Sequence, residues 1–175
     1  MVGVFFITGI HGVGKTTLCN QFKTQSEIHF FSASQLIKSM KPDSLDSSSK
    51  NVQDIDNNQT ILLHAIESKL LNFPVIVLDG HSTLFNSHGE IKRLPMSVFE
   101  PMKLRAICCV HEQPAIITER LLARDNCTYD VSFIKQHQEI ELAHSADIAN
   151  HLGIPFQTVT SSQSDIFIKT LNSWT

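Results

Sequence analysis

Two hydrophobic patterns alternate along the 175-residue chain. Short runs of consecutive apolar residues, such as those at 2–8 and 74–78, are typical of parallel strands that are buried on both faces. Longer stretches repeat their apolar residues every three or four positions, as amphipathic helices do. Together the patterns predict strands over 2–8, 28–31, 74–78, 104–110 and 154–159, and helices over 14–24, 35–40, 57–71, 114–124, 131–152 and 165–174.

This alternation of strand and helix indicates an α/β fold. We expect a three-layer, doubly wound, five-stranded parallel sheet in a single domain, for which 175 residues suffice. The serine-rich segment 41–56 is expected to be a mobile excursion, and residues 82–95 a loop. In sheets of this kind ligands bind at the carboxyl ends of the strands, so the search for chemistry begins there.

The first predicted strand leads directly into a glycine-rich segment. Residues 9–17 read Gly-Ile-His-Gly-Val-Gly-Lys-Thr-Thr and fit the phosphate-binding P-loop pattern G-x-x-x-x-G-K-[ST]. Its glycines can adopt backbone angles that other residues avoid, so that N–H groups turn toward a phosphate. The positive end of the following helix favours the same anion. We expect ATP to contact Gly9, His11, Gly12, Val13, Gly14, Lys15, Thr16 and Thr17.

Within this segment two side chains have distinct chemical roles. Lys15 can reach the β and γ phosphates, and the Thr16 hydroxyl can ligate Mg²⁺. A chance match on a glycine-bearing turn is the alternative. The agreement of strand, loop and amphipathic helix argues against it.

Asp79 follows a buried apolar strand, which is the position of a Walker B acid. A carboxylate there can hold the Mg²⁺ that Thr16 also contacts, directly or through water. The alternative role is to cap a turn. His81, two residues on, can position a water molecule or a phosphate group, and on sequence alone it is equally well explained as a turn residue.

Arg120 and Arg124 lie four residues apart in a predicted helix and therefore share one face of it. That helix runs into a polar loop at 125–130. Two arginines beside such a loop can close over a phosphoryl group and neutralise transition-state charge. Surface pairing with Glu119 or Asp125 is the alternative, and the position relative to the P-loop favours the catalytic role.

Three histidines, His137, His144 and His151, recur every seven residues in the long helix predicted over 131–152. Ligands of one metal ion lie close together, whereas seven residues of helix span about 10 Å. We therefore interpret these histidines as packing and surface residues.

Composition narrows the choice of partners. The net charge of −3, from 14 basic and 17 acidic residues, gives no electrostatic case for duplex nucleic acid as the main partner. No apolar run approaches the roughly 18 residues that a membrane span requires, and the apolar opening is too short for a signal peptide. The absence of a C-x-x-C pair favours reduced cysteines and a cytoplasmic protein, the four being Cys19, Cys108, Cys109 and Cys127.

The P-loop occurs in several classes of protein, and the sequence separates them. A GTPase would carry N-K-x-D, which is absent here. An ABC ATPase needs a signature sequence and a larger domain. An AAA+ motor needs a second helical domain, for which the chain leaves little room. The small P-loop kinases remain, in which positioning and charge neutralisation supply most of the catalysis.

Three blocks of the chain resemble the archaeal-type adenylate kinases and the eukaryotic nuclear adenylate kinase-like ATPases. They are the P-loop at 9–17, Val-Leu-Asp-Gly-His at 77–81 and Glu-Arg-Leu-Leu-Ala-Arg at 119–124. The long helix is also similar around 136–139. In this family Asp-x-His ends the Walker B strand and paired arginines begin the lid, which Asp79 with His81 and Arg120 with Arg124 match.

The resemblance implies a division of the single domain 1–175. The core comprises 1–31 and 73–175, an acceptor-binding excursion lies at about 32–72, and a short lid lies at about 124–131. It also implies transfer of a phosphoryl group from ATP to a nucleoside monophosphate with Mg²⁺, and a catalytic set of Lys15, Asp79, His81, Arg120 and Arg124.

The acceptor remains open. The excursion is rich in serine and asparagine and contains Lys38, Lys41 and Lys50 but no arginine, whereas family members often bind the acceptor phosphate with basic groups. Four polar residues can hydrogen-bond a base or sugar, or can be cap and surface residues: Ser34, Gln35, Asn58 and Gln59. A P-loop ATPase or regulatory ATP-binding protein of this fold is the first alternative, and a kinase for another small metabolite is the second.

Overall fold

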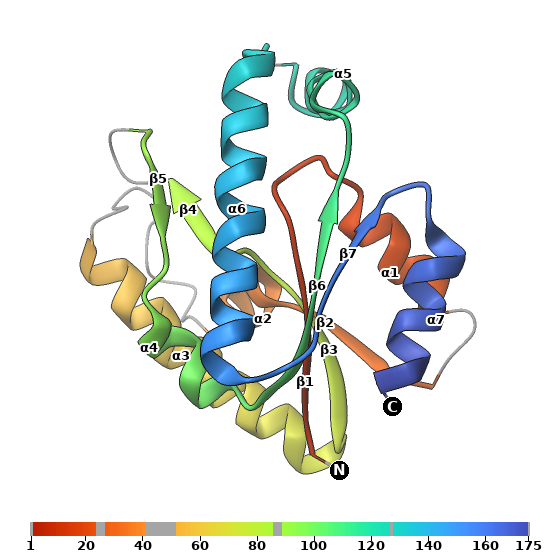
Figure 1. Ribbon diagram of the computed structural model, residues 1–175. Helices are drawn as coiled ribbons and strands as arrows, with labels where there is room; N and C mark the ends of the chain where they lie inside the picture. Colours follow the sequence, from red (N-terminus) through yellow and green to blue (C-terminus); the bar gives the residue numbers. More distant parts are fainter. Residues whose placement is uncertain (1, 24–26, 41–51, 86–88, 127, 175) are drawn as a thin grey trace.

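The computed structural model describes residues 2–23, 27–40, 52–85, 89–126 and 128–174, except for the side chains of 52–56 (Figure 1). A five-stranded parallel sheet runs through the centre, in the order β2-β3-β1-β6-β7. Its strands are β1 (Gly3–Thr8), β2 (His29–Ser32), β3 (Val75–Asp79), β6 (Leu104–His111) and β7 (Phe156–Thr160). The order reverses at β1, as doubly wound sheets require, so the predicted fold class is confirmed.

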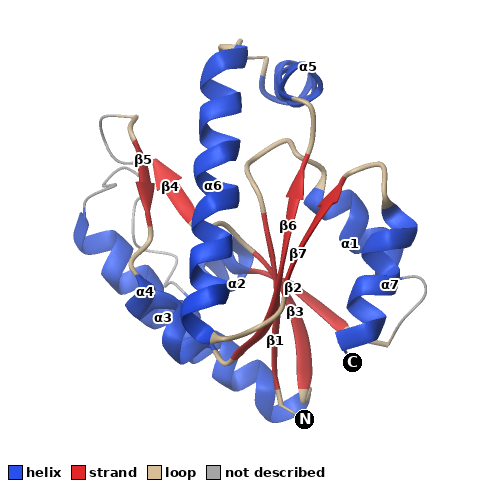
Figure 2. Ribbon diagram, in the orientation of Figure 1, coloured by secondary structure: helices blue, strands red, loops and turns tan. Residues whose placement is uncertain are grey.

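Helices cover both faces of this sheet (Figure 2). The alternation of side chains along β1 separates two cores, with Phe5 and Ile7 facing one way and Val4 and Phe6 the other. On the first side pack α1 (Lys15–Lys23), α5 (Pro114–Asp125) and α7 (Ser164–Trp174). On the second side pack α2 (Ala33–Met40), α3 (Val52–Asn72) and the short α4 (Met96–Phe99). The long α6 (Val131–Leu152) contributes to both cores.

The predicted elements match the structure to within a few residues, and two expectations fail. First, the segment expected as an excursion at 41–56 is helical from Val52, because α3 extends upstream of its apolar stripe. Once nucleated, a helix gains one hydrogen bond for each residue added, so polar residues can continue it. Residues 41–51 lie outside the described residues.

Second, the expected loop at 82–95 contains a small antiparallel hairpin, β4 (Thr83–Phe85) with β5 (Ile91–Arg93). Each strand has only three residues, so no alternating pattern was long enough to predict it. The hairpin is joined to β6 through α4 and a 3-10 turn at Glu100–Met102.

Capping residues close to each helix end define where α5 stops and α6 begins, next to the proposed lid. Asn126 ends α5 with φ 52°, and its N–H donates to the Leu122 carbonyl. Asp130 begins α6, with its side chain accepting from the Ser132 N–H at 2.7 Å. The expected lid at 124–131 therefore comprises the end of α5, a short connection and the start of α6. Its movement stays a prediction.

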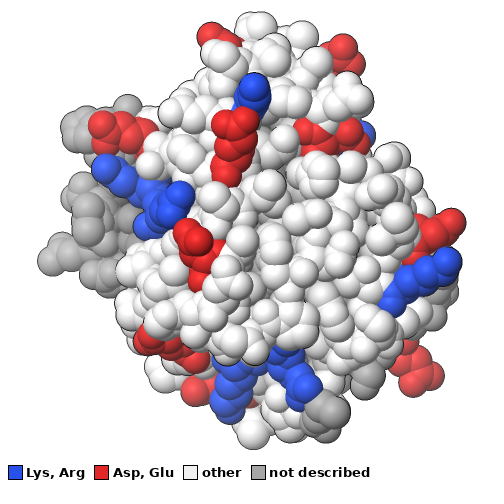
Figure 3. Space-filling view, in the orientation of Figure 1, with Lys and Arg blue, Asp and Glu red and all other residues white. Residues whose placement is uncertain are grey.

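Surface charge is distributed in small groups. On the face that Figure 3 shows, acidic and basic side chains of the described residues lie interspersed instead of forming a broad basic area. Among the helices that the structure describes, none is long and apolar enough to cross a membrane.

The first core rests on aromatic packing between α1 and α7, which gives a stability prediction. Phe167 is fully buried and meets the Phe22 ring edge-on at 6.3 Å between centroids. We expect Phe167→Ala to lower the free energy of unfolding by about 3–5 kcal/mol. The neighbouring Ile166→Ala, at a position 44% exposed, should cost much less. Urea unfolding of both variants checks this, and equal losses would contradict the assigned core.

Candidate functional site

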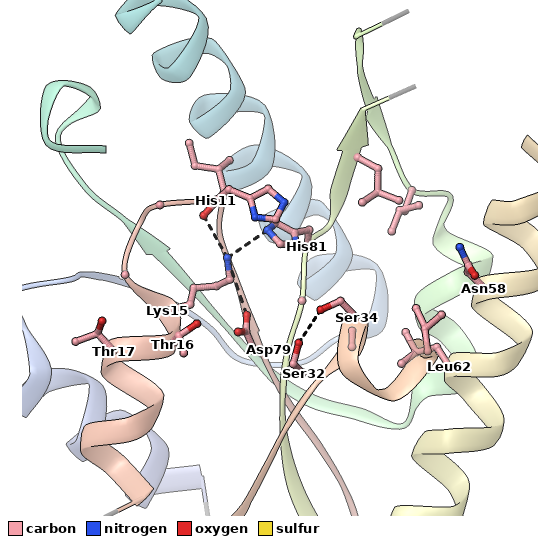
Figure 4. A pocket seen from close by; sticks show the side chains of 18 of the residues that line it. His11, Lys15, Thr16, Thr17, Ser32, Ser34, Asn58, Leu62, Asp79 and His81 are labelled. Atoms are coloured by element: carbon pink, nitrogen blue, oxygen red, sulfur yellow. Dashed lines mark hydrogen bonds and ion pairs between the residues drawn. The ribbon is translucent and has the colours of Figure 1, made fainter. Parts of the chain in front are cut away.

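Lys15 lies at the centre of the site, at the beginning of α1. Its ammonium is buried and donates to the Gly9 carbonyl at 2.5 Å and to the Ile10 carbonyl at 3.2 Å. Figure 4 shows Lys15 between Asp79 and His81. Asp79 Oδ1 lies 4.0 Å from Nζ. Burial lowers the Lys15 pKa, and the negative charges of Asp79 and Glu141 oppose that shift. The P-loop carbonyls thus hold the Lys15 ammonium, which would exchange these hydrogen bonds for phosphate oxygens when ATP binds.

The glycines behave as the motif predicts, since Gly9, Gly12 and Gly14 all have positive φ. At Gly9, with φ +138°, an added Cβ would lie 2.4 Å from the Val110 carbonyl oxygen. At Gly14, with φ +106°, it would lie 2.8 Å from Ser161 Cβ. Both positions therefore need glycine for conformation and for space.

Asp79 and Thr16 line the same cavity, which brings together the two predicted Mg²⁺ ligands. Asp79 ends β3 in register with Ile7 of β1 and Ser32 of β2, so it stands at the carboxyl edge of the sheet. Burial raises the Asp79 pKa, and the Lys15 ammonium opposes that shift. One carboxylate and one hydroxyl fit Mg²⁺, which usually keeps several waters and adds phosphate oxygens to few protein ligands.

Two histidine rings pack against each other beside the lysine, tilted by 38°. The rings of His11 and His81 have centroids 4.2 Å apart, and His81 Nε2 lies 3.4 Å from Lys15 Nζ. Burial first, and then the Lys15 charge, lowers the His81 pKa well below its usual value. The same two causes, in the same order, lower the His11 pKa. With its proton on Nδ1, a neutral His81 would accept from the Lys15 ammonium through Nε2. Its role at the phosphates stays a prediction.

The two arginines occupy different positions at the same cavity. The Arg120 guanidinium donates to the Val13 carbonyl at 3.1 Å and to Ser161 Oγ at 3.1 Å, so it braces the outside of the P-loop. Arg124 forms two hydrogen bonds with Asp125, both 2.6 Å, in an exposed pair. The surface alternative is therefore partly observed for Arg124, although it also lines the cavity.

A cavity of about 730 Å³ connects the P-loop with α2 and α3. Its wall includes Ser34, Asn58 and Gln59, so three of the four predicted acceptor residues are brought together with Lys15. Figure 4 shows Asn58 and Leu62 across the cavity from Lys15 and Asp79. Gln35 is exposed on α2 and does not line the cavity, because it lies one residue, or about 100° of helix, beyond Ser34.

Of the remaining predicted P-loop contacts, His11, Gly12, Gly14 and Thr17 line the cavity. Gly9 and Val13 are buried within the loop and do not line the cavity. Their backbone carbonyls accept hydrogen bonds, that of Gly9 from Lys15 and that of Val13 from Arg120.

Sequence analysis missed Glu141, which is fully buried in α6. Its carboxylate accepts hydrogen bonds from the Gly9 N–H and from Ser82 and Thr83. The sequence does contain a signal for this residue. Glu141 lies seven residues from both Ile134 and Ile148, which are buried on the same helix. A charged residue in an apolar stripe indicates a buried polar cluster.

The three helix histidines are packing and surface residues, as interpreted. His137 and His144 are buried, and His151 is exposed. His137 lies 3.1 Å from Thr83 Oγ1, His144 Nε2 lies 2.8 Å from the Leu94 carbonyl, and His151 pairs with Glu100.

The fold and this site define a P-loop kinase-like protein. A family described as an AAA domain matches residues 8–134, from the end of β1 to the first turn of α6. The chain belongs to this family, whose description names a domain type and no reaction.

Two adenylate kinases are distant relatives. The enzyme of Pyrococcus abyssi is 25% identical over 158 residues, covering 85% of this chain and 81% of its own length. That of Thermoplasma acidophilum is 23% identical over 171 residues, covering 90% and 88%. A candidate kinase from Chloroflexus aurantiacus has a similar fold, with a TM-score of 0.59, 14% identity and coverage of 99% and 98%.

Proposed function

We propose that this protein transfers the γ-phosphoryl group of ATP to a nucleoside monophosphate, as adenylate kinases do. The observation that carries the proposal is one continuous cavity that joins the P-loop and Asp79 to a wall on α2 and α3, where Ser34, Asn58 and Gln59 are the polar residues. Its volume of about 730 Å³ lies within the range of small-molecule sites. The two adenylate kinase relatives support the same reaction class.

The chemistry requires positioning more than a strong base. Lys15 would exchange its bonds to the Gly9 and Ile10 carbonyls for the phosphates, which brings a desolvated positive charge to the group being transferred. Thr16 and Asp79 would hold Mg²⁺, which supplies charge neutralisation at the phosphates when bound. The acceptor oxygen forms the new bond to phosphorus as the bond to ADP breaks, so that ATP and AMP give two ADP.

The α3 wall supplies unpaired groups for the acceptor. Asn58 Oδ1 and Gln59 Nε2 are buried, with no hydrogen-bond partner among the described residues. Leaving such atoms without a partner is costly, so binding would be favoured for a molecule that turns these amides toward the cavity and offers one donor and one acceptor. A nucleobase edge offers both.

A second candidate, a kinase for another small metabolite, is favoured by the charge of this wall. Among the described lining residues, Lys15, Arg120 and Arg124 are the lysines and arginines, and all belong to the P-loop end. The wall around Ser34, Asn58 and Leu62 is neutral. A neutral acceptor with a hydroxyl group would suit it without a cation for a second phosphate.

Two further expectations stay proposals. The protein acts on small molecules and not on nucleic acid. It works in the cytoplasm, which the free, buried thiols of Cys19, Cys108 and Cys109 support.

An acceptor panel tests the proposed function. Purified protein with Mg²⁺ and ATP should make ADP with AMP or another nucleoside monophosphate, at a rate well above that without acceptor. Lys15→Ala should lower this rate about 10²–10³-fold, because charge that grows in the transition state loses its contact. Products are quantified by chromatography.

The other outcomes of the panel are equally informative. Transfer only to unphosphorylated hydroxyl compounds would favour the second candidate. Phosphate release that no acceptor stimulates would favour an ATPase. Wild-type turnover in folded Lys15→Ala would contradict all three.

Asp79→Asn should raise the Mg²⁺ concentration required for turnover by about tenfold or more, because an amide is a poorer ligand for a hard cation than a carboxylate. The matched control is Asp147→Asn, which removes an exposed carboxylate that pairs with Arg93. A Mg²⁺ titration at fixed ATP measures the shift. An unchanged titration would make Asp79 a structural turn residue.

The arginines should differ because their contacts differ. Arg124→Ala should lower turnover by about 10² while ATP affinity changes little, since only closure over the phosphates would engage that group. Arg120→Ala should weaken ATP binding as well, because Arg120 braces the P-loop carbonyls. Binding and saturating turnover are measured for both, with the surface variant Arg93→Ala as control. Wild-type behaviour of Arg124→Ala would leave it a surface charge.

A further inference from the structure

The crevice of the site opens where β1 and β3 separate. The two strands remain paired as far as Ile7 and Asp79, and the last bond runs from the Gly80 N–H to the Ile7 carbonyl at 3.0 Å. Beyond it, one chain becomes the P-loop and the other leads to the β4–β5 hairpin. Gly9 and Ser82 lie outside the strands and Thr83 begins the hairpin, yet all three residues are buried. Their backbone N–H groups therefore require an acceptor.

Glu141 supplies that acceptor from α6. Its Oε1 accepts from the Gly9 N–H at 3.2 Å, the Ser82 N–H at 2.8 Å and the Thr8 hydroxyl. Its Oε2 accepts from the Thr83 N–H at 2.8 Å and the Thr83 hydroxyl at 2.5 Å. One fully buried carboxylate thus receives five hydrogen bonds from both sides of the crevice.

The chemistry of this cluster selects a carboxylate. Two oxygens offer about four lone-pair positions, whereas an amide has one oxygen and an NH₂ group that would face further donors. Hydrogen bonds to a charged acceptor are also the stronger ones, which offsets the cost of burying the charge. A neutral side chain of the same shape would therefore leave donors on one side of the crevice unsatisfied.

We propose that Glu141 is a positioning residue that holds the P-loop and the loop after β3 at the separation that phosphate binding and transfer need. Gly9 and Thr8 form its P-loop half. Ser82 and Thr83 form its hairpin half, directly after His81. Leu84 of the hairpin also lines the large cavity, so the hairpin half lies next to the proposed acceptor site.

Two substitutions test the P-loop half and the hairpin half of the Glu141 cluster separately, and both keep the carboxylate. Thr8→Val loses one donor at the start of the P-loop, and Thr83→Val loses one donor on the hairpin, each with little change of shape. The matched control is Ser145→Ala. Ser145 is also fully buried on α6 and hydrogen-bonds to the Glu141 carbonyl at 2.8 Å and to Ser82 Oγ at 3.1 Å, but no bond joins it to Gly9 or Thr83.

Three quantities are measured for Glu141→Gln and these variants: the thermal midpoint, the Kd for ATP with Mg²⁺ by calorimetry, and saturating turnover with AMP or, without acceptor, ATP hydrolysis. Glu141→Gln should raise Kd about tenfold and lower turnover about 10²-fold, as a displacement of about 1 Å can. Thr8→Val should act mainly on Kd. Thr83→Val should act mainly on turnover and leave Kd within about twofold, and Ser145→Ala should leave both near wild type.

Two results would overturn the proposal. One is a folded Glu141→Gln with wild-type Kd and turnover. The other is that Ser145→Ala loses ATP affinity and turnover to the same extent as the other variants, in proportion to the fall in thermal midpoint. The cluster would then contribute only to stability. If Glu141→Gln does not fold, the division between Thr8→Val and Thr83→Val decides. Of these measurements, only turnover rests on the proposed function. If the wild-type protein has no kinase activity, the Kd for ATP still tests the role of Glu141.

Discussion

One fully buried carboxylate, that of Glu141, accepts hydrogen bonds at the point where two neighbouring strands part. A parallel sheet satisfies its backbone only while the strands stay side by side, and a ligand crevice requires that they diverge. Here the buried N–H groups of Gly9, just after β1, and of Ser82 and Thr83, beyond β3, all donate hydrogen bonds to the Glu141 carboxylate. Helix α6 is therefore hydrogen-bonded both to the P-loop and to the loop after β3.

This arrangement places charge where phosphate chemistry needs it. Lys15 is buried among loop carbonyls with Asp79 at 4.0 Å, and Glu141 is a further negative charge that favours its protonated form. Fixed charges in a site of low exposure interact more strongly than the same charges in water. The positive groups gather at the P-loop end of the cavity, while the α3 wall offers neutral amides. In the proposed reaction, ATP would bind at the positive end of the cavity and the acceptor would hydrogen-bond at the α3 wall.

The sequence predicted those parts of the fold whose signals are local. The three central strands β1, β3 and β6 are largely buried, so their apolar runs identify them. The P-loop glycines have the positive φ angles that their motif requires. The β4–β5 hairpin was missed because three-residue strands carry no readable alternation. Glu141 was missed because its partners lie 58–133 residues away, and no local pattern records them. Gln35 was predicted as either an acceptor contact or a cap or surface residue, and on α2 it is exposed and does not line the cavity.

A structure of the protein with Mg²⁺ and a non-hydrolysable ATP analogue tests the central claim most directly. We expect the phosphates to lie within the 9–17 loop, with Lys15 Nζ moved from the Gly9 and Ile10 carbonyls to phosphate oxygens. The Glu141 carboxylate should keep its bonds to Gly9, Ser82 and Thr83. Phosphates bound elsewhere, or a Glu141 side chain turned away from either wall, would contradict the account.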